Sequence, residues 1–229
     1  MTALQLPSAV LWDMDGTLID TEPFWFAAET ELVGRFGGTW THDQAISLVG
    51  SGLRDGARVL QDHGVRMEVD DIVAWQTDFV TERLVGDLPW RPGALELLAA
   101  LRDSGVPTAL VTMSVRRMAV AVAAALPIGG FDVVVAGDDV ARPKPDPEAY
   151  LRAAELLGVD VTRCVAIEDS PPGLAAAIAS GAATVGVPHQ AVLPDPDLER
   201  APARWRIWRT LEGSTPQDLA AVADELARA

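Results

Sequence analysis

Short apolar runs alternate with helical patterns along much of this chain, and that alternation constrains the fold more than any other feature. Runs of strand length occupy residues 9–12, 108–111, 133–136, 164–167 and 184–187. Helical patterns lie between the later runs, with Asp146 expected to cap one helix and Ser170 the next. Because the connections are short, the strands should be parallel and joined by right-handed helical crossovers. The sequence therefore predicts an α/β protein with a doubly wound, Rossmann-like parallel sheet.

The segment between Thr17 and Pro92 contains no convincing strand and is longer than a crossover requires. Four amphipathic helices fit it instead. Thr21 is expected to cap the first, and Thr41 with Gln44 forms a capping-box pattern for the second. The third covers roughly residues 53–63 and the fourth roughly 72–84. We therefore predict an α-helical cap domain at residues 18–87, inserted into an α/β core made of residues 1–17 and 88–229.

The C-terminal part is expected to continue with a proline-rich loop over residues 188–202, a strand over 205–210 and a helix over 216–227. Residues 204–209 (RWRIWR) interleave arginine with tryptophan, a composition that can occur on nucleic-acid-binding surfaces. The overall charge favours another interpretation, an edge strand whose arginine side chains extend into solvent.

The charge balance limits the partners of this protein. The chain has 18 Lys and Arg against 33 Asp and Glu, a formal net charge of -15, which repels nucleic acid and anionic membranes. No basic segment followed by an apolar run marks a secretory signal, and Cys164 stands among apolar residues as the single cysteine. We therefore expect a cytoplasmic monomer without nucleic-acid or membrane partners, with Cys164 buried as a small hydrophobic residue.

Polar residues follow the predicted strands where those strands end. They are Asp13 and Asp15, then Thr112 and Ser114, then Lys144, then Glu168 and Asp169. In an open parallel sheet the carboxyl ends of the strands form one crevice, so these residues should converge there. Several carboxylates in one crevice repel one another unless a cation lies among them. Because all the ligands are oxygen atoms, the sequence favours Mg²⁺.

A lysine and a hydroxyl beside such a metal meet the requirements of phosphoryl transfer. No P-loop motif is present. A carboxylate nucleophile fits better: Asp13 would attack phosphorus, and Asp15 would serve as general acid and then base. An EF-hand calcium loop does not fit, because Gly16 comes too early and no glutamate closes the loop. Lys144 is the sole lysine of the chain. Its ammonium is a compact point charge, for which arginine is a poor substitute beside a phosphate group.

At these residues the chain resembles the haloacid dehalogenase-like hydrolase superfamily. The first motif of that family is similar to residues 13–17 (DMDGT), and the second, a hydroxyl after an apolar strand, is similar to residues 110–112 (LVT). The third resembles residues 142–147 (RPKPDP), and the fourth resembles residues 167–173 (IEDSPPG). All four occur in the family's order, and the resemblance covers nearly the whole chain.

The resemblance implies a role for each matching residue. Asp13 would be nucleophile and metal ligand, and Asp15 would be the acid/base whose backbone carbonyl also binds Mg²⁺. Thr112 and Lys144 would hold the phosphate, with Ser114 as a competitor for the role of Thr112. Asp169 would be a carboxylate metal ligand and Glu168 a second or indirect one.

The helical segment after the first motif is similar to the subgroup that contains β-phosphoglucomutase and sugar-phosphate phosphatases. Arg54 resembles a position of the cap that contacts the substrate in proteins of that subgroup. The preferred function is a Mg²⁺-dependent phosphatase that hydrolyses small phosphomonoesters through an aspartyl phosphate. Asp15 argues against dehalogenation. A phosphosugar mutase remains an alternative, although the mutase has a histidine in the region that here reads EPFWF (residues 22–26). A non-catalytic binding or regulatory protein on the same fold is the alternative of another class.

Overall fold

The computed structural model describes residues 5–84, 86, 88–194 and 205–228, and it confirms the predicted α/β fold. A six-stranded sheet has the order β3-β2-β1-β4-β5-β6, and every neighbouring pair is parallel. The strands are β1 (Val10–Trp12), β2 (Thr108–Val111), β3 (Val133–Val135), β4 (Val165–Glu168), β5 (Ala183–Gly186) and β6 (Trp205–Ile207). The strand order reverses at β1, so a crevice is expected at the carboxyl ends of β1 and its neighbours.

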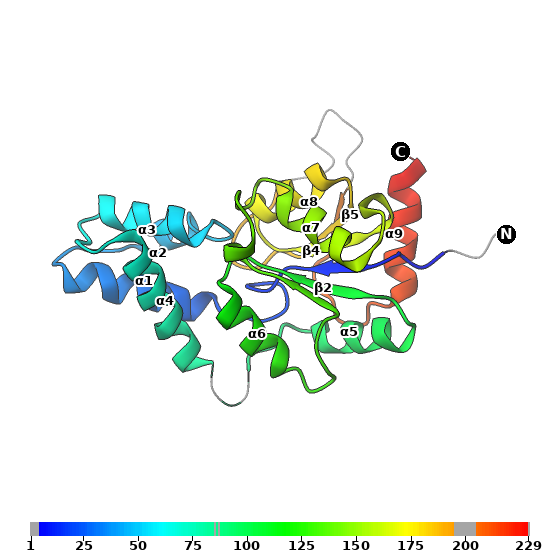
Figure 1. The fold of residues 1–229 in the computed structure, drawn as a ribbon, viewed down its shortest axis with the longest axis horizontal. Helices are drawn as coiled ribbons and strands as arrows, with labels where there is room; N and C mark the ends of the chain where they lie inside the picture. Colours follow the sequence, from blue (N-terminus) through cyan, green and yellow to red (C-terminus); the bar gives the residue numbers. More distant parts are fainter. Residues whose placement is uncertain (1–4, 85, 87, 195–204, 229) are drawn as a thin grey trace.

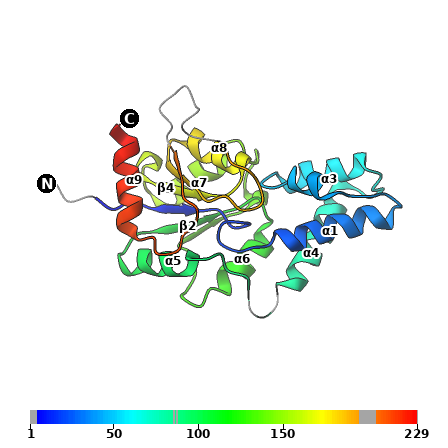
Figure 2. The same ribbon diagram turned by 180° about the vertical axis from the view of Figure 1, so that it is seen from behind.

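Helices cover both faces of the sheet, which is why its strands are apolar throughout rather than alternating (Figures 1 and 2). Successive strand residues face opposite sides: Val10 and Trp12 pack into one buried cluster, and Leu11 packs into another. The first cluster includes residues of α5 (Ala94–Asp103), α6 (Arg116–Ala124) and α9 (Pro216–Arg228). The second includes residues of α7 (Glu148–Leu157) and α8 (Pro171–Ser180). Cys164 is buried and free, as expected, and burial raises the pKa of its thiol to about 11.

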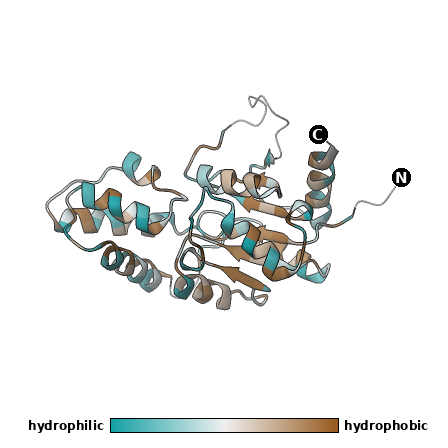
Figure 3. Cartoon of the chain, turned by 45° about the horizontal axis from the view of Figure 1, so that its top comes forward, coloured by the Kyte–Doolittle hydropathy of each residue, from teal (hydrophilic) through white to brown (hydrophobic). Residues whose placement is uncertain are grey.

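Of the five helices described between β1 and β2, the first four gather at one end of the molecule, on the left in Figure 1. They are α1 (Glu22–Arg35), α2 (His42–Ile46), α3 (Leu53–Asp62) and α4 (Val69–Arg83). A buried cluster that includes Leu32, Leu60 and Ile72 holds them together. Figure 3 shows the strands of the sheet as strongly hydrophobic, whereas these helices carry hydrophilic residues on their outer sides. The division into a core and a cap domain remains a prediction.

The two chain segments that lead into and out of these helices lie side by side. Ile19 forms bridges to both Asp15 and Trp90. The Asp20 amide donates to the carbonyl of Pro89 (2.8 Å), and the Arg91 amide donates to that of Leu18 (2.9 Å). The two connections between the helical segment and the sheet therefore run together, directly beside the Asp13–Asp15 loop. Every helix in the described ranges is too short or too polar to cross a membrane.

Two capping predictions differ from the structure. Thr21 is the N-cap residue of α1, but its hydroxyl makes no capping hydrogen bond and instead donates to Asp15. The N-cap of α7 is Pro147 rather than Asp146, since the helix begins at Glu148, although the Asp146 carboxylate still accepts from the Glu148 amide. The predictions that Ser170 caps α8 and that Thr41 and Gln44 form a capping box are confirmed.

The last strand is shorter than predicted. β6 ends at Ile207 because that residue pairs with Gly186, the last residue of β5, beyond which no partner strand continues. Its position at the sheet edge agrees with the prediction, and Arg206 forms an ion pair with Glu225 of α9. The predicted loop at 188–202 is described only up to residue 194; its remainder and Arg204 lie outside the described residues. Two short 3₁₀ helices, Gly137–Asp139 and Val161–Arg163, precede α7 and β4.

Candidate active site

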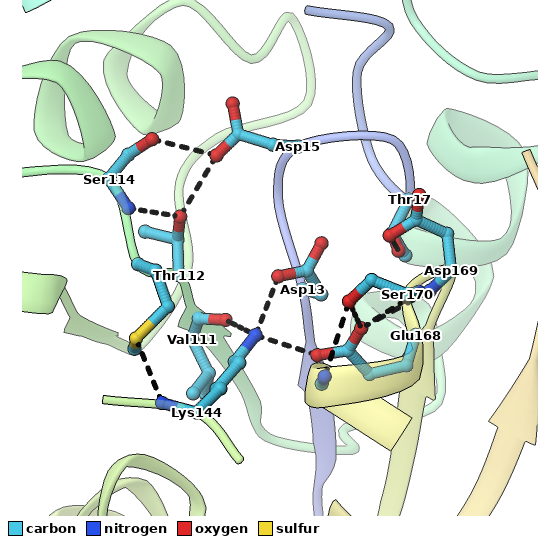
Figure 4. A network of polar contacts seen from close by, with 12 residues as sticks. Asp13, Asp15, Thr17, Val111, Thr112, Ser114, Lys144, Glu168, Asp169 and Ser170 are labelled. Carbon is cyan, nitrogen blue, oxygen red and sulfur yellow. Dashed lines mark hydrogen bonds and ion pairs between the residues drawn. The ribbon is translucent and has the colours of Figure 1, made fainter. Parts of the chain in front are cut away.

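The strand ends bring the predicted residues together at the carboxyl edge of the sheet (Figure 4). Asp13 directly follows β1, Thr112 follows β2, and Glu168 is the last residue of β4. These strands are neighbours in the sheet, and Lys144 reaches them from the loop before α7. Asp13 and Glu168 are buried, with 6% and 0% of their surface exposed.

Lys144 lies at the centre of this arrangement. Its Nζ donates to Asp13 Oδ1 (2.6 Å), to Glu168 Oε1 (2.6 Å) and to the carbonyl of Val111 (3.0 Å), so all three of its protons have acceptors. Burial disfavours the ammonium, but the carboxylates of Asp13 and Glu168 outweigh it and raise the pKa of Lys144 above its ordinary value. Lys144 is therefore a fixed positive charge that holds one oxygen of Asp13.

Three carboxylates beside Lys144 form a candidate metal centre. Asp13, Glu168 and Asp169 each offer an oxygen atom, and these atoms lie within 4.8 Å of one another. Among the described residues, Asp13 Oδ2 and Asp169 Oδ2 are buried without a hydrogen-bond partner. Burial and the charge of Glu168 raise the pKa of Asp13 to about 8, and burial and the charge of Asp13 raise that of Asp169. A cation would relieve this repulsion and pair with the two free oxygens, so the cluster fits a metal.

The carboxylate of Asp15 points away from this cluster (Figure 4). Its Oδ2 accepts hydrogen bonds from the hydroxyls of Thr112 (3.1 Å) and Ser114 (2.8 Å). Its Oδ1 accepts from the Thr21 hydroxyl (2.6 Å) and from Trp25 Nε1 (3.1 Å), both at the start of α1. Four donors thus hold Asp15 between the sheet and the helical segment. Asp15 lies close to Asp13, the candidate nucleophile, but its carboxylate points away from the carboxylate cluster.

Several residues of this network lie outside the four motifs. The sequence predicts Thr21 as a helix cap, but its hydroxyl donates to Asp15. Trp25 packs in the buried core and also donates from Nε1 to Asp15. The hydroxyl of Tyr150, on α7, donates to Glu168 Oε1 at 2.5 Å, the oxygen that also receives Lys144 Nζ. The sequence around Tyr150 has the pattern of an ordinary buried helix face and therefore does not indicate the hydrogen bond to Glu168.

A pocket opens above these groups and is closed on its far side by the helical segment. Asp13, Asp15, Ser114 and Lys144 form its floor. Its walls include Trp25 and Phe26 of α1, Gln76 of α4, and the loop around Gly50. A Cβ atom on Gly50 would lie 2.3 Å from Ser170 Oγ, so this loop lies directly against the start of α8.

Arg54 is not brought to this pocket. Its guanidinium forms an ion pair with Asp70 of α4, and both side chains are largely exposed. It lines an adjoining groove that also includes Arg58 and Val115 and shares Gly52, Leu53 and Met113 with the pocket. Its assignment as a substrate contact remains a prediction, and this arrangement gives it no support.

Gly16 allows the Asp13–Asp15 loop to approach the metal-ligand candidates closely. It has φ +86°, and a Cβ atom there would lie 2.1 Å from Asp169 Oδ2. We expect Gly16→Ala to lower the free energy of unfolding by more than the backbone strain of about 1–3 kcal/mol, because Asp169 must also move. Gly37→Ala is the matched control, since it has φ +80° with open space around the added methyl.

Urea denaturation of both variants, with and without a divalent cation, tests this expectation. Gly16→Ala should be the less stable variant and should lose the stabilisation by the cation, which Gly37→Ala should retain. Equal losses with equal stabilisation by the cation would contradict the close approach of Gly16 to the metal site.

Comparisons with known proteins show the relatives of this chain. The chain matches the family model described as haloacid dehalogenase-like hydrolase over residues 7–181. It is 34% identical over 187 residues to a protein of Thermotoga maritima named phosphorylated carbohydrates phosphatase, covering 79% of this chain and 85% of that protein. It is 33% identical over 211 residues to the protein CbbY of Rhodobacter capsulatus, covering 87% and 92% of the two chains.

Among solved structures, CbbY from Rhodobacter sphaeroides in complex with phosphate superposes with a TM-score of 0.80 at 27% identity. The match covers 93% of this chain and all of that chain (100%). A β-phosphoglucomutase from Clostridium difficile has a TM-score of 0.81 at 20% identity, which shows a shared fold.

Proposed function

This chain belongs to the haloacid dehalogenase-like hydrolases, and on that premise we propose that it is a Mg²⁺-dependent phosphatase of small phosphorylated metabolites. Its substrates would be sugar phosphates or similar phosphomonoesters, as the names of several relatives suggest for those proteins. The observation that carries the proposal is the position of Asp13: a buried carboxylate held at one oxygen by Lys144, with its other oxygen unpartnered among the described residues, on the floor of a pocket.

The metal site supports magnesium in particular. Asp13 and Asp169 would hold the ion, with Glu168 as a second or indirect ligand and the backbone carbonyl of Asp15 completing the set. All donors are oxygen atoms, the choice expected for a hard cation that keeps water and a substrate phosphate in its remaining positions. When bound, the ion supplies charge neutralisation for the phosphoryl oxygens.

The protein groups divide the reaction between them. Asp13 attacks phosphorus through a carboxylate oxygen, the bond from phosphorus to the leaving oxygen breaks, and Asp15 gives its proton to that oxygen. Asp15 then takes a proton from a water molecule, which attacks phosphorus and releases phosphate from Asp13. Lys144 fixes the orientation of Asp13. Thr112 and Ser114, whose hydroxyls donate to Asp15, would hold the phosphoryl group when the substrate is bound.

The contacts of Trp25 favour hydrolysis over mutase activity. Trp25 stands on the first helix after Asp13, in the region where the mutase has its histidine, and its indole donates to Asp15. None of the described residues lining the pocket is a histidine. A non-catalytic role is disfavoured because every carboxylate, hydroxyl and lysine of the four motifs is present. Asp13, Asp15 and Lys144 line one pocket, and Glu168 and Asp169 lie beside Asp13.

Release of inorganic phosphate from a panel of phosphorylated sugars, polyols, nucleotides and small acids tests the proposal. We expect turnover of sugar or polyol monophosphates with Mg²⁺ and its loss on chelation with EDTA, restored by added Mg²⁺. The Asp13→Asn protein controls for contaminating phosphatases. Turnover that survives complete chelation, or that is equal in the Asp13→Asn protein, would contradict the proposal.

A further inference from the structure

Tyr150 contacts the reaction centre, and the proposed chemistry gives it no role. It is the single tyrosine of the chain, stands on α7 and is fully buried (0% exposed). Its hydroxyl donates to Glu168 Oε1 (2.5 Å), the oxygen that also accepts from Lys144 Nζ (2.6 Å). The ammonium of Lys144 lies 5.1 Å from the centre of the tyrosine ring. Two side chains, one charged and one neutral, therefore donate to the same carboxylate oxygen.

Both oxygens of the Glu168 carboxylate have protein donors. Oε2 accepts from the Asp169 amide (3.2 Å) and from the Ser170 hydroxyl (3.2 Å), at the start of α8. The side chain of Glu168 is 0% exposed, so bulk water does not reach it. A buried carboxylate oxygen that loses its donors is strongly destabilised. The hydroxyl of Tyr150 therefore secures Oε1 a donor that does not depend on Lys144.

Lys144 has no free proton for the phosphate that it would hold in the proposed reaction. Its three protons go to Asp13 Oδ1, to Glu168 Oε1 and to the carbonyl of Val111. To hold a phosphoryl oxygen, the ammonium must give up one of these acceptors. Among the described residues, Glu168 Oε1 is the only one of the three that a second side chain also serves. Release of Glu168 therefore costs least, and the bond to Asp13 can persist.

We infer that Tyr150 is a positioning residue that allows Lys144 to turn from Glu168 to the phosphoryl group. One N–H of Lys144 passes from Glu168 Oε1 to a phosphoryl oxygen, while the Tyr150 hydroxyl stays on Oε1 and keeps that buried charge satisfied. Only hydrogen bonds change in this step, and no proton is transferred. The inference rests on the proposed function and adds to it a residue outside the four motifs.

Tyr150→Phe removes only the hydroxyl and is tested by two binding constants. Lys144 is then the sole donor to Glu168 Oε1 and is held there. The dissociation constant of inorganic phosphate for the Mg²⁺-saturated protein should therefore rise about tenfold, the effect of one hydrogen bond to a charged group. The dissociation constant of Mg²⁺ without phosphate should not change, because Lys144 need not leave Glu168. Calorimetric titration measures both constants.

Ser180→Ala is the matched control. It also removes a buried hydroxyl that donates a short hydrogen bond, here to the carbonyl of Ala177 (2.6 Å), at the end of α8 and outside the pocket lining. It should leave both dissociation constants unchanged. If Tyr150→Phe weakened Mg²⁺ and phosphate binding equally, the tyrosine would only shape the carboxylate cluster, and the inference would be overturned. An unchanged phosphate constant in Tyr150→Phe would overturn it as well.

The single tyrosine also allows a spectroscopic test with every hydrogen bond of the site in place. Protein labelled with meta-fluorotyrosine has one fluorine resonance, from position 150. Because the charge of Lys144 lies beside the ring, its movement should shift this resonance when phosphate saturates the Mg²⁺-loaded protein. A resonance that stays in place at saturation would show that Lys144 does not turn, and this result would overturn the inference even if Tyr150→Phe failed to fold.

Phosphate release separates this inference from the proposed function. With the best substrate of the panel, Tyr150→Phe should lower kcat/KM about tenfold, the same loss as in phosphate binding. Unchanged kcat/KM in Tyr150→Phe, with hydrolysis that still requires Asp13, would overturn the role of Tyr150 and leave the phosphatase intact. Absence of Asp13-dependent hydrolysis of every compound in the panel would overturn both.

Discussion

Replacement of Asp13 with asparagine should reduce turnover on the order of 10⁴-fold or more, because the amide cannot act as the carboxylate nucleophile. The substitution is nearly isosteric, and the asparagine oxygen can still accept from Lys144. Steady-state phosphate release at saturating Mg²⁺ measures the loss. A variant with more than about a tenth of the parent rate would contradict the assignment of Asp13 as nucleophile.

The same variant should gain stability in metal-free buffer, and the gain should depend on pH. Burial and Glu168 raise the pKa of Asp13 from 3.8 to about 8, so between these values the folded protein binds more protons than the unfolded chain. The stability of the parent protein therefore falls as pH rises through this range, whereas asparagine removes this contribution. Urea midpoints for the two proteins should diverge from about pH 4 to pH 8, and parallel curves would contradict the raised pKa.

Replacement of Lys144 with methionine is the second change with a large expected effect. It leaves the buried carboxylates of Asp13 and Glu168 without their cation, so we expect a loss of about 3–5 kcal/mol of stability in metal-free buffer and a loss of activity. Adding Glu168→Gln should recover part of the stability because it removes one of the uncompensated charges.

Arg142→Met is the matched control for this prediction. Arg142 also pairs with two carboxylates, Asp146 and Glu148, but its side chain is 69% exposed, so the change should cost at most about 1 kcal/mol. Denaturant unfolding of the three variants provides the measurement. If Lys144→Met and Arg142→Met were equally stable, Lys144 would not be the buried counter-charge that the structure shows.

The sheet and the convergence of the motif residues could be predicted because they follow from short local patterns. Apolar runs identify buried parallel strands, and parallel strands deliver their carboxyl ends to one edge. That is why Asp13 and Lys144, 131 positions apart in the sequence, could be placed together and are joined at 2.6 Å. The strand boundaries follow to within a residue or two except at β6, where the partner strand decides the length.

The direction of individual side chains could not be predicted in the same way. Thr21 has the local pattern of a helix cap, yet a tertiary hydrogen bond to Asp15 replaces the capping bond. Arg54 carries no local signal that it pairs with Asp70, because this depends on how α3 packs on α4. For the same reason Glu22 and Gln76 resemble ordinary helix residues in the sequence, and only the packing of α1 and α4 places them in the pocket.

Chemical trapping of the phosphorylated enzyme tests the central claim most directly. The protein is mixed with Mg²⁺ and its best substrate, quenched during turnover and treated with borohydride, which reduces an acyl phosphate on aspartate to homoserine. Peptide mass spectrometry should then find homoserine at position 13, dependent on both substrate and Mg²⁺. Turnover without modification of Asp13, or modification of Asp15 or Asp169 in its place, would contradict the account.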